Sequence, residues 1–160
     1  MNTKTLHFAA ALAGLATFGL FAAAPAEAAM FTNGGSSPFG GSQCMDVRGG
    51  ATAAFTPVQT WACHGWLNQH FSMQGMSVYA IGSTGGAQNC LDVAYAGTTA
   101  GTTVNIYPCN GSTAQQFYYY GGRLYYPHGG LCVDSVNGAN GTRLIVNYCS
   151  SSWTQQWQIK

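Results

Sequence analysis

The stretch that decides the fold reads Cys90-Leu91-Asp92-Val93, then Val104-Asn105-Ile106-Tyr107-Pro108-Cys109, then Gln115-Gln116-Phe117. The same pattern occurs twice more, as Cys44–Val47, Val58–Cys63 and Asn68–Phe71 upstream and as Cys132–Asp134, Ile145–Cys149 and Gln155–Trp157 downstream. The opening cysteines of successive units lie 46 and 42 residues apart, and in every unit a glutamine follows the second cysteine by six residues. This constant register indicates a threefold internal repeat, with units at about residues 35–75, 76–120 and 121–160.

The first 28 residues have the pattern of a secretory signal peptide. Lys4 supplies a positive charge, an apolar run follows from Phe8 to Ala24, and Ala26 and Ala28 are small residues at the positions that a signal peptidase reads. A membrane anchor is the alternative, but the run of about 17 residues is at the lower limit for a spanning helix and no positive flank follows it. We expect cleavage near Ala28, secretion to the extracellular space (or to the periplasm in a bacterium), and no membrane span in residues 29–160.

Charge is scarce after the predicted leader. The only carboxylate side chains there are Asp46, Asp92 and Asp134, and they occupy the same position of each repeat. The cations are Arg48, Arg123, Arg143 and Lys160. Four scattered cations cannot form a basic face, so a nucleic-acid partner is not expected.

All six cysteines follow the leader, two in each repeat. An even number of cysteines in an exported chain indicates disulfides. The repeat favours the pairs Cys44–Cys63, Cys90–Cys109 and Cys132–Cys149. A zinc site is the alternative, but no C-x-x-C and no paired histidines at ligand spacing are present. We expect no metal and no cofactor.

The residues after the leader predict an all-β fold. No apolar period of 3.6 residues is sustained there, and glycines recur at intervals of about 8–12 residues, which favours many short strands. Gly121-Gly122 between two β-prone runs predicts a hairpin. The third repeat ends too early for its last strand, so Met30–Asn33 is expected to supply that strand and close a ring of about twelve strands, four per repeat.

The C-x-D, aromatic-x-Cys and Gln-x-aromatic pattern, repeated three times, resembles the ricin B-chain type of β-trefoil lectin. It is also similar to the trefoil carbohydrate-binding modules of many secreted glycoside hydrolases. The resemblance covers about residues 35–160 and implies a β-trefoil of three pseudo-symmetric repeats that binds carbohydrate. Because a fold does not fix a function, the sites are considered separately.

A sugar site needs an acceptor for neighbouring hydroxyls, amides that both donate and accept, and a flat ring for the apolar face of the sugar. In the first repeat, Asp46 would accept from the hydroxyl pair, Trp61 would stack, and Gln59 and Asn68 would make amide contacts. Gln69 would steady Asp46 from behind. These positions match the sugar-contacting positions of the lectin family one by one.

The other two repeats are less complete. The second has Ala114 where the first has Asn68, which predicts a weaker or differently selective site. It keeps Asp92, Asn105, Tyr107 and Gln115. The third keeps Asp134 and Gln155 but has Ile145, Asn147 and Thr154 at the positions of Gln59, Trp61 and Asn68, so we expect it to bind poorly.

Structural roles are the alternative for many of these residues. The aspartates could cap local turns, and the glutamines of the Gln-x-aromatic motif could tie strands to neighbouring backbone. Phe71, Phe117 and Trp157 are predicted core residues. For Trp66, Trp153 and the run 118–120, extra sugar contacts are the alternative, but we interpret most of them as residues of alternating barrel strands. We interpret His64, His70 and His128 as surface or loop residues.

The leading hypothesis is a secreted, non-catalytic lectin for galactose- or xylose-type glycans, with the strongest site in repeat 1. The alternatives are a cell-binding subunit of a secreted toxin, a protein-partner trefoil with a toxin or enzyme chain as its partner, and, more remotely, a glycoside hydrolase. A hydrolase needs two carboxyl groups within about 5–9.5 Å. A domain of this size has a radius of gyration of about 14 Å, so three sites related by a threefold axis would lie roughly 20–25 Å apart. Each site would then have one carboxylate, which is too few for a hydrolase.

Overall fold

The computed structural model describes residues 27–33, 41–83 and 88–160, so almost all of the predicted leader lies outside the described residues. The described parts consist of strands, single-turn 3₁₀ helices and loops. The strands are β1 (Phe31–Asn33), β2 (Gln43–Val47), β3 (Thr56–Ala62), β4 (Phe71–Gln74), β5 (Ser77–Ala80), β6 (Asn89–Val93), β7 (Val104–Pro108), β8 (Tyr118–Tyr120), β9 (Arg123–Tyr126), β10 (Leu131–Asp134), β11 (Ile145–Tyr148) and β12 (Trp157–Ile159). The 3₁₀ turns are η1 (Arg48–Gly50), η2 (Leu67–Gln69), η3 (Ile81–Ser83), η4 (Ala94–Ala96), η5 (Thr113–Gln115) and η6 (Trp153–Gln155).

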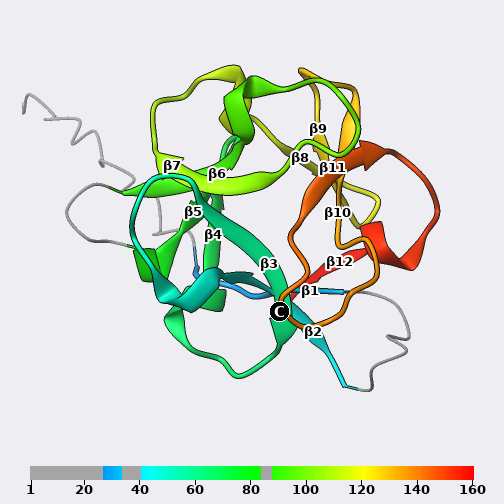
Figure 1. Ribbon diagram of the computed structural model, residues 1–160. Helices are drawn as coiled ribbons and strands as arrows, with labels where there is room; N and C mark the ends of the chain where they lie inside the picture. The colour runs from blue at the N-terminus through cyan, green and yellow to red at the C-terminus, as the bar shows by residue number, and fades with distance from the viewer. Residues whose placement is uncertain (1–26, 34–40, 84–87) are drawn as a thin grey trace, which may run out of the picture.

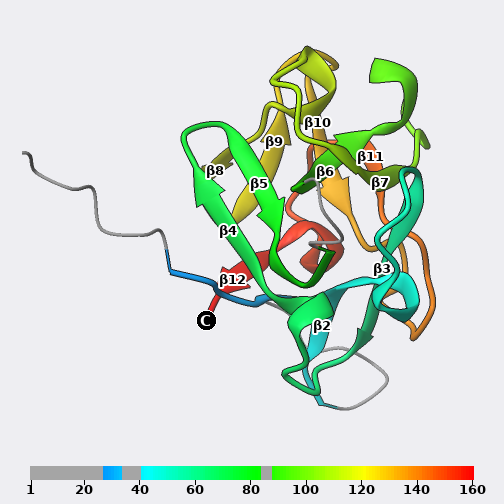
Figure 2. The same cartoon turned by 90° about the vertical axis from the view of Figure 1, so that its left-hand side faces the viewer.

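The strands are arranged as three lobes around a common centre, seen end-on in Figure 1 and from the side in Figure 2. Each repeat opens with an antiparallel pair, β2–β3, β6–β7 or β10–β11, that carries its aspartate. The register places Asp46 opposite Gln59, Asp92 opposite Asn105, and Asp134 opposite Ile145. This confirms the β-trefoil expected from the threefold pattern.

Two hairpins follow the opening pairs of the first two repeats. Strands β4 and β5 pair across Gly75, and β8 and β9 pair across Gly121-Gly122. The φ angles of Gly121 and Gly122 are 57° and 78°, the left-handed values that a two-residue primed turn requires. The predicted hairpin at this glycine pair is therefore present.

The chain closes on itself through β1 and β12, which pair antiparallel with Phe31 opposite Ile159 and Asn33 opposite Trp157. The sheet order is β12-β1-β2-β3-β7-β6-β5-β4 in one sheet and β11-β10-β9-β8 in the other. The N-terminal segment thus supplies the strand that the third repeat lacks, as predicted. With β12 on one side and β2 on the other, β1 has no free edge open to association.

One hydrophobic core fills the centre. The predicted core positions Phe71, Phe117 and Trp157 are 0%, 0% and 1% exposed. Around them pack Phe31, Met45, Val47, Val58, Val78, Ala80, Leu91, Val93, Val104, Ile106, Leu124, Tyr126, Leu131, Val133, Leu144 and Val146.

Three disulfides join Cys44 to Cys63, Cys90 to Cys109 and Cys132 to Cys149, the pairs that the repeat predicts. Each closes a loop of 17 to 19 residues, which stabilises the fold by about 3 kcal/mol in the chain-entropy model. Among the described residues, no helix has the length and apolar character needed to cross a membrane.

Candidate functional site

One hydrogen-bond unit recurs in all three repeats and fixes the aspartates. In each, the glutamine Nε2 donates to Oδ2 of the aspartate, at 3.1, 3.1 and 2.9 Å, and also to a backbone carbonyl just before the second cysteine. The glutamine Oε1 accepts from the backbone N–H just after that cysteine. The pairs are Gln69–Asp46, Gln115–Asp92 and Gln155–Asp134. Because these glutamines are at most 1% exposed, they hold the aspartates and are not positioned to touch a ligand.

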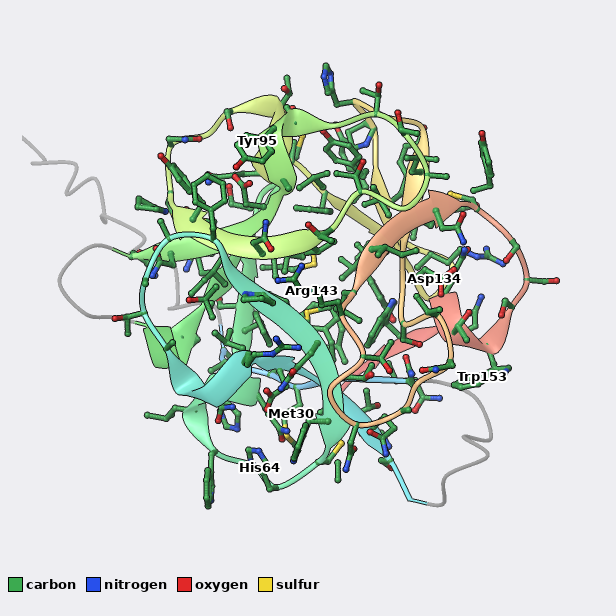
Figure 3. The ribbon with its side chains drawn as sticks, in the orientation of Figure 1. Met30, His64, Tyr95, Asp134, Arg143 and Trp153 are labelled. Carbon is green, nitrogen blue, oxygen red and sulfur yellow. A yellow bond between two sulfur atoms is a disulfide. The ribbon has the colours of Figure 1, made fainter. Side chains whose placement is uncertain are left out.

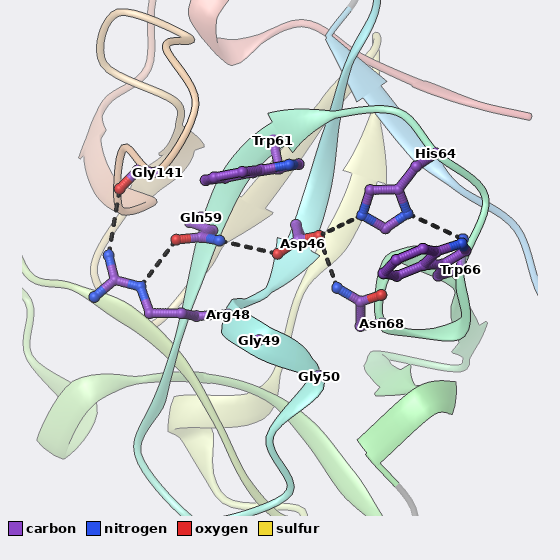
Figure 4. Close-up of a pocket in the computed structure, with 10 residues that line it drawn as sticks. All are labelled: Asp46, Arg48, Gly49, Gly50, Gln59, Trp61, His64, Trp66, Asn68 and Gly141. Carbon is purple, nitrogen blue, oxygen red and sulfur yellow. Dashed lines mark hydrogen bonds and ion pairs between the residues drawn. The ribbon is translucent and has the colours of Figure 1, made fainter.

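In repeat 1 the Asp46 carboxylate is enclosed by several donors (Figure 4). Gln59 Nε2 donates to Oδ1 at 3.0 Å, and Asn68 Nδ2 donates to Oδ2 at 2.8 Å. His64 Nε2 lies 3.5 Å from Oδ2. Of the amide donors, Gln59 and Gln69 are buried whereas Asn68 is half-buried. Asn68 is thus the amide that an incoming hydroxyl can displace at least cost.

Arg48 orients Gln59 and is itself held by a loop of another repeat. Arg48 Nε donates to Gln59 Oε1 at 2.9 Å, and Arg48 Nη2 donates to the carbonyl of Gly141 at 3.3 Å. Gly141 N in turn donates to Thr60 O at 2.8 Å. The loop of repeat 3 therefore forms one wall of the repeat-1 site.

These residues line a cavity of about 730 Å³ together with two tryptophans. Trp61 is 40% exposed and Trp66 is 72% exposed, and Figure 4 shows them on opposite sides of Asp46. The His64 ring lies 4.7 Å from that of Trp66. The hollow thus combines a fixed acceptor and an amide with two apolar ring surfaces.

In repeat 2 the Asp92 carboxylate is left open. Within the described residues, Gln115 is its one hydrogen-bond partner, on Oδ2, and the side chain of Asn105, directly across the strand pair, forms no hydrogen bond. Burial raises the pKa of the Asp92 carboxyl, and the hydrogen bond from Gln115 offsets part of that rise. In this site, therefore, one oxygen of Asp92 can still accept a hydrogen bond, and the Asn105 amide beside it can still donate one.

Three aromatic rings surround Asp92. Its cavity of about 220 Å³ is lined by Tyr107, Phe55 and Tyr95. The Phe55 ring lies 5.0 Å from that of Tyr107 and 5.4 Å from that of Tyr95. Phe55 belongs to the loop between β2 and β3, so repeat 1 supplies a wall of the repeat-2 site.

Phe55 has an unusual backbone for its residue type. Phe55 N donates to Ile106 O, and at the equivalent joints Gly141 N donates to Thr60 O and Gly101 N to Val146 O. All three residues have positive φ, at 63°, 79° and 94° respectively, but only Phe55 carries a side chain there. Tyr95 also has positive φ, at 55°. Such conformations cost about 1–3 kcal/mol each and concentrate at functional sites.

In repeat 3 the aspartate is occupied by the protein itself. Val136 N donates to Asp134 Oδ1 at 2.7 Å, and Asn147 Nδ2 donates to Oδ2 at 3.1 Å. Asn147 stands where the other repeats have Trp61 and Tyr107, since each lies opposite the first cysteine of its unit. The third aspartate thus serves as the turn-forming group that was considered as an alternative for all three.

The residue most readily missed from sequence is Phe55, because its contacts lie in a different repeat. His64 was interpreted as a surface or loop residue, and it does lie in a loop, but its ring reaches Asp46. The signal in the sequence is a difference between repeats: the residue after the second cysteine is His64 in repeat 1 but Asn110 and Ser150 in the other two. Arg48 directly follows the C-x-D-V segment of repeat 1, and Tyr95 lies two residues after that of repeat 2, but the repeat pattern predicts neither as a site residue.

The three sites are separate. His64, Tyr95 and Asp134, one from each repeat, lie in different lobes in Figure 3. The repeat-1 and repeat-2 cavities are each lined by one carboxylate. A paired-carboxylate hydrolysis mechanism needs two such groups within about 5–9.5 Å. The geometry suits reversible binding of a polyhydroxylated ligand.

In the described part of the chain, twelve strands form the trefoil, and two repeats have an Asp-centred hollow walled by aromatic rings, an arrangement that fits the lectin class. The family model described as the ricin-type β-trefoil lectin domain matches residues 37–157. The chain belongs to the ricin-type β-trefoil lectin family. A search of curated proteins found no match.

Solved structures share the fold. The designed threefold-symmetric protein ThreeFoil is 24% identical with a TM-score of 0.69, over 82% of this chain and 96% of that one. The C-half of an earthworm R-type lectin, in complex with GalNAc, is 11% identical with a TM-score of 0.65, over 84% and 98%. A mosquitocidal holotoxin is 15% identical with a TM-score of 0.67, over 86% of this chain but only 17% of its own.

Proposed function

We propose that this chain is a secreted, non-catalytic lectin that binds galactose- or xylose-type glycans at the Asp46 and Asp92 sites. The single observation that carries the proposal is the repeat-1 hollow, where a fixed carboxylate lies between two partly exposed tryptophans. Secretion is supported by the three disulfides, which persist in oxidising compartments.

At the repeat-1 site, one sugar hydroxyl takes the place of Asn68 on Asp46 Oδ2, and the released amide binds a neighbouring hydroxyl. The apolar face of the ring stacks on Trp61. Trp66, on the other side of the hollow, is placed to contact the next sugar of a chain. The remaining donors, Gln59 and Gln69, keep the carboxylate oriented throughout.

Repeat 1 is the strongest site in this proposal because it has the larger cavity and both amide donors. Repeat 2 is weaker because Ala114 replaces the second amide, although Phe55 and Tyr95 enlarge its aromatic wall. Repeat 3 has lost binding because Asn147 and Val136 occupy its carboxylate.

A toxin- or enzyme-associated role is the second candidate. The likeness of the fold to one part of a mosquitocidal holotoxin favours it. In that case the chain serves as the glycan-binding component beside a catalytic or pore-forming partner chain. Recovery of a second protein with the chain from native culture medium would support this role.

The test is a glycan array with a pull-down on insoluble polysaccharides, comparing the mature wild type with Trp61→Ala and Asp46→Asn. We expect binding to a galactose- or xylose-containing class, weakened about tenfold by Trp61→Ala because a stacking face is lost. Tyr148→Ala is the matched control, since Tyr148 is 75% exposed and lies outside both cavities. Thermal unfolding of each variant confirms that it is folded. A wild type that binds no glycan, or binding unchanged by both substitutions, contradicts the proposal.

A further inference from the structure

An aromatic face separate from the three aspartate sites covers the β8–β9 hairpin. Tyr118 and Tyr120 alternate with Tyr119 along β8, so the two flanking rings share the outer face. Tyr119 lies on the other face of the strand, where its hydroxyl donates to Trp157 O at 2.6 Å. The outer tyrosines are 50% and 82% exposed, and neighbouring exposed rings on one face are the kind of patch that marks an interaction site.

The strand register arranges these side chains in two rows that run across the strands. Tyr118 lies opposite Tyr125, which in turn lies opposite Cys132 of β10. Tyr120 lies opposite Arg123 in the neighbouring row. These side chains and the Cys132–Cys149 disulfide line a cavity of about 470 Å³, and we call it the tyrosine groove. Its volume accommodates one or two sugar rings.

Arg123 gives the groove a fixed positive charge. Its Nε donates to Ser150 O at 2.7 Å, and with the Gln156 amide turned so that its oxygen faces Arg123, that oxygen accepts from Nε at 3.3 Å and from Nη2 at 3.2 Å. Both partners are neutral. Among the described residues, no carboxylate forms a salt bridge with Arg123. The guanidinium is therefore held in place with its charge uncompensated.

We propose that the tyrosine groove is a binding site for an acidic glycan, with Arg123 pairing the sugar carboxylate and Tyr120 and Tyr118 stacking on the sugar rings. A guanidinium binds a carboxylate through charge-assisted hydrogen bonds, and tyrosine offers an apolar face with a polar tip. The groove contains no aspartate, so it lacks the acceptor that marks the other sites. The proposal does not depend on the aspartate sites.

The charge pattern favours an acidic sugar over a nucleic acid. Single-stranded nucleic acid presents one phosphate per nucleotide, and its binding proteins track the backbone with a positively charged groove. Only one cation lines this groove. A single guanidinium matches a ligand with one carboxylate per sugar.

The experiment titrates the mature protein with tetragalacturonate and with its methyl ester, which has the same rings without charge. The wild type is expected to bind the acid about tenfold more tightly than the ester. Arg123→Gln should remove that preference, whereas Arg143→Gln, which removes an equal charge from an exposed position, should keep it. Tyr120→Ala should weaken both ligands, and Tyr120→Phe should restore them because the stacking face returns. Sialyllactose, with lactose as its neutral counterpart, shows whether a terminal acid is preferred to an acid within a polymer.

Four outcomes overturn the proposal. The first is no binding of either acidic probe by the folded wild type. The second is equal affinity for acid and ester. The third is an acid preference lost in Asp46→Asn but kept in Arg123→Gln, which would place the acid in the repeat-1 site and leave the proposed lectin function intact. The fourth is tighter binding of oligothymidylate than of tetragalacturonate. Conversely, an Arg123-dependent acid preference in a protein that binds no neutral glycan would support this groove and contradict the aspartate sites.

Discussion

At the residue scale, Phe55 shows most clearly where the protein departs from its own symmetry. The two equivalent joints use glycine at positive φ, and a phenylalanine at φ 63° strains the backbone. We predict that Phe55→Gly is more stable than Phe55→Ala by about 1 kcal/mol, because glycine relieves the strain and alanine does not. Urea unfolding with the disulfides intact measures the difference.

The same two variants, Phe55→Gly and Phe55→Ala, distinguish the effect of backbone strain on stability from the effect of the ring on binding. Both variants lose the ring that lines the Asp92 site, so both should weaken glycan binding there to the same extent. Titration in an Asp46→Asn background isolates the second site. Unchanged affinity in both variants would show that Phe55 has no part in binding.

Asp92 allows a prediction about pH. Burial raises its pKa in the folded state above the ordinary value of 3.8, so the folded protein favours the protonated form. Its contribution to stability is therefore fully present below the unfolded-state pKa and is lost as the pH rises through the folded-state pKa. Asp92→Asn removes this loss, because the Asn oxygen still accepts from Gln115 and no charge has to be buried.

We expect the stability of Asp92→Asn relative to wild type to increase as the pH rises from the ordinary carboxyl pKa, and then to level off. Unfolding curves collected across acidic pH measure this. A difference that does not change with pH would mean that the Asp92 pKa is the same in the folded and unfolded states.

At the element scale, β1 is the strand that completes the ring. Phe31 is 1% exposed and packs edge-on against Phe71 and Tyr119, with ring centroids 6.2 Å apart in each case. Phe31→Ala should therefore cost about 3–5 kcal/mol. Its register partner Ile159 is 43% exposed, so Ile159→Ala should cost less than about 1 kcal/mol. Chemical denaturation gives both values, and similar costs would show that β1 does not anchor the core.

The elements were predictable where the repeat controls them. The disulfide pairs, the Gly121-Gly122 hairpin and the closing role of the segment at Phe31 all follow from spacing and turn chemistry, since they depend on local sequence or on the symmetry itself. The walls of the sites were not predictable in the same way. Phe55 and Gly141 reach the sites of neighbouring repeats, and the sequence of one repeat contains no signal of which loop lies beside it.

The aspartates illustrate the same limit. Their equivalent positions in the sequence suggested three versions of one site, but their surroundings differ. Asp46 is enclosed by amides, Asp92 is open on one oxygen, and Asp134 accepts from the backbone of its own turn. The register of each strand pair could be predicted from the repeat. The number of hydrogen bonds that each aspartate accepts could not, because it depends on which neighbouring groups donate to it.

At the scale of the whole molecule, the two proposed aspartate sites belong to different repeats of one domain, so the affinity for a polymer should exceed that for a single sugar. Engaging two sites on one chain of sugars raises the apparent affinity by about 10²–10⁴ when the geometry permits it. We predict that Asp46→Asn and Asp92→Asn each remove most of this polymer enhancement, while each leaves the free-sugar affinity of the other site unchanged. Parallel titrations with monosaccharide and with polysaccharide measure the ratio. An enhancement that survives in either single variant, but disappears in Arg123→Gln, would instead assign the second point of attachment to the tyrosine groove.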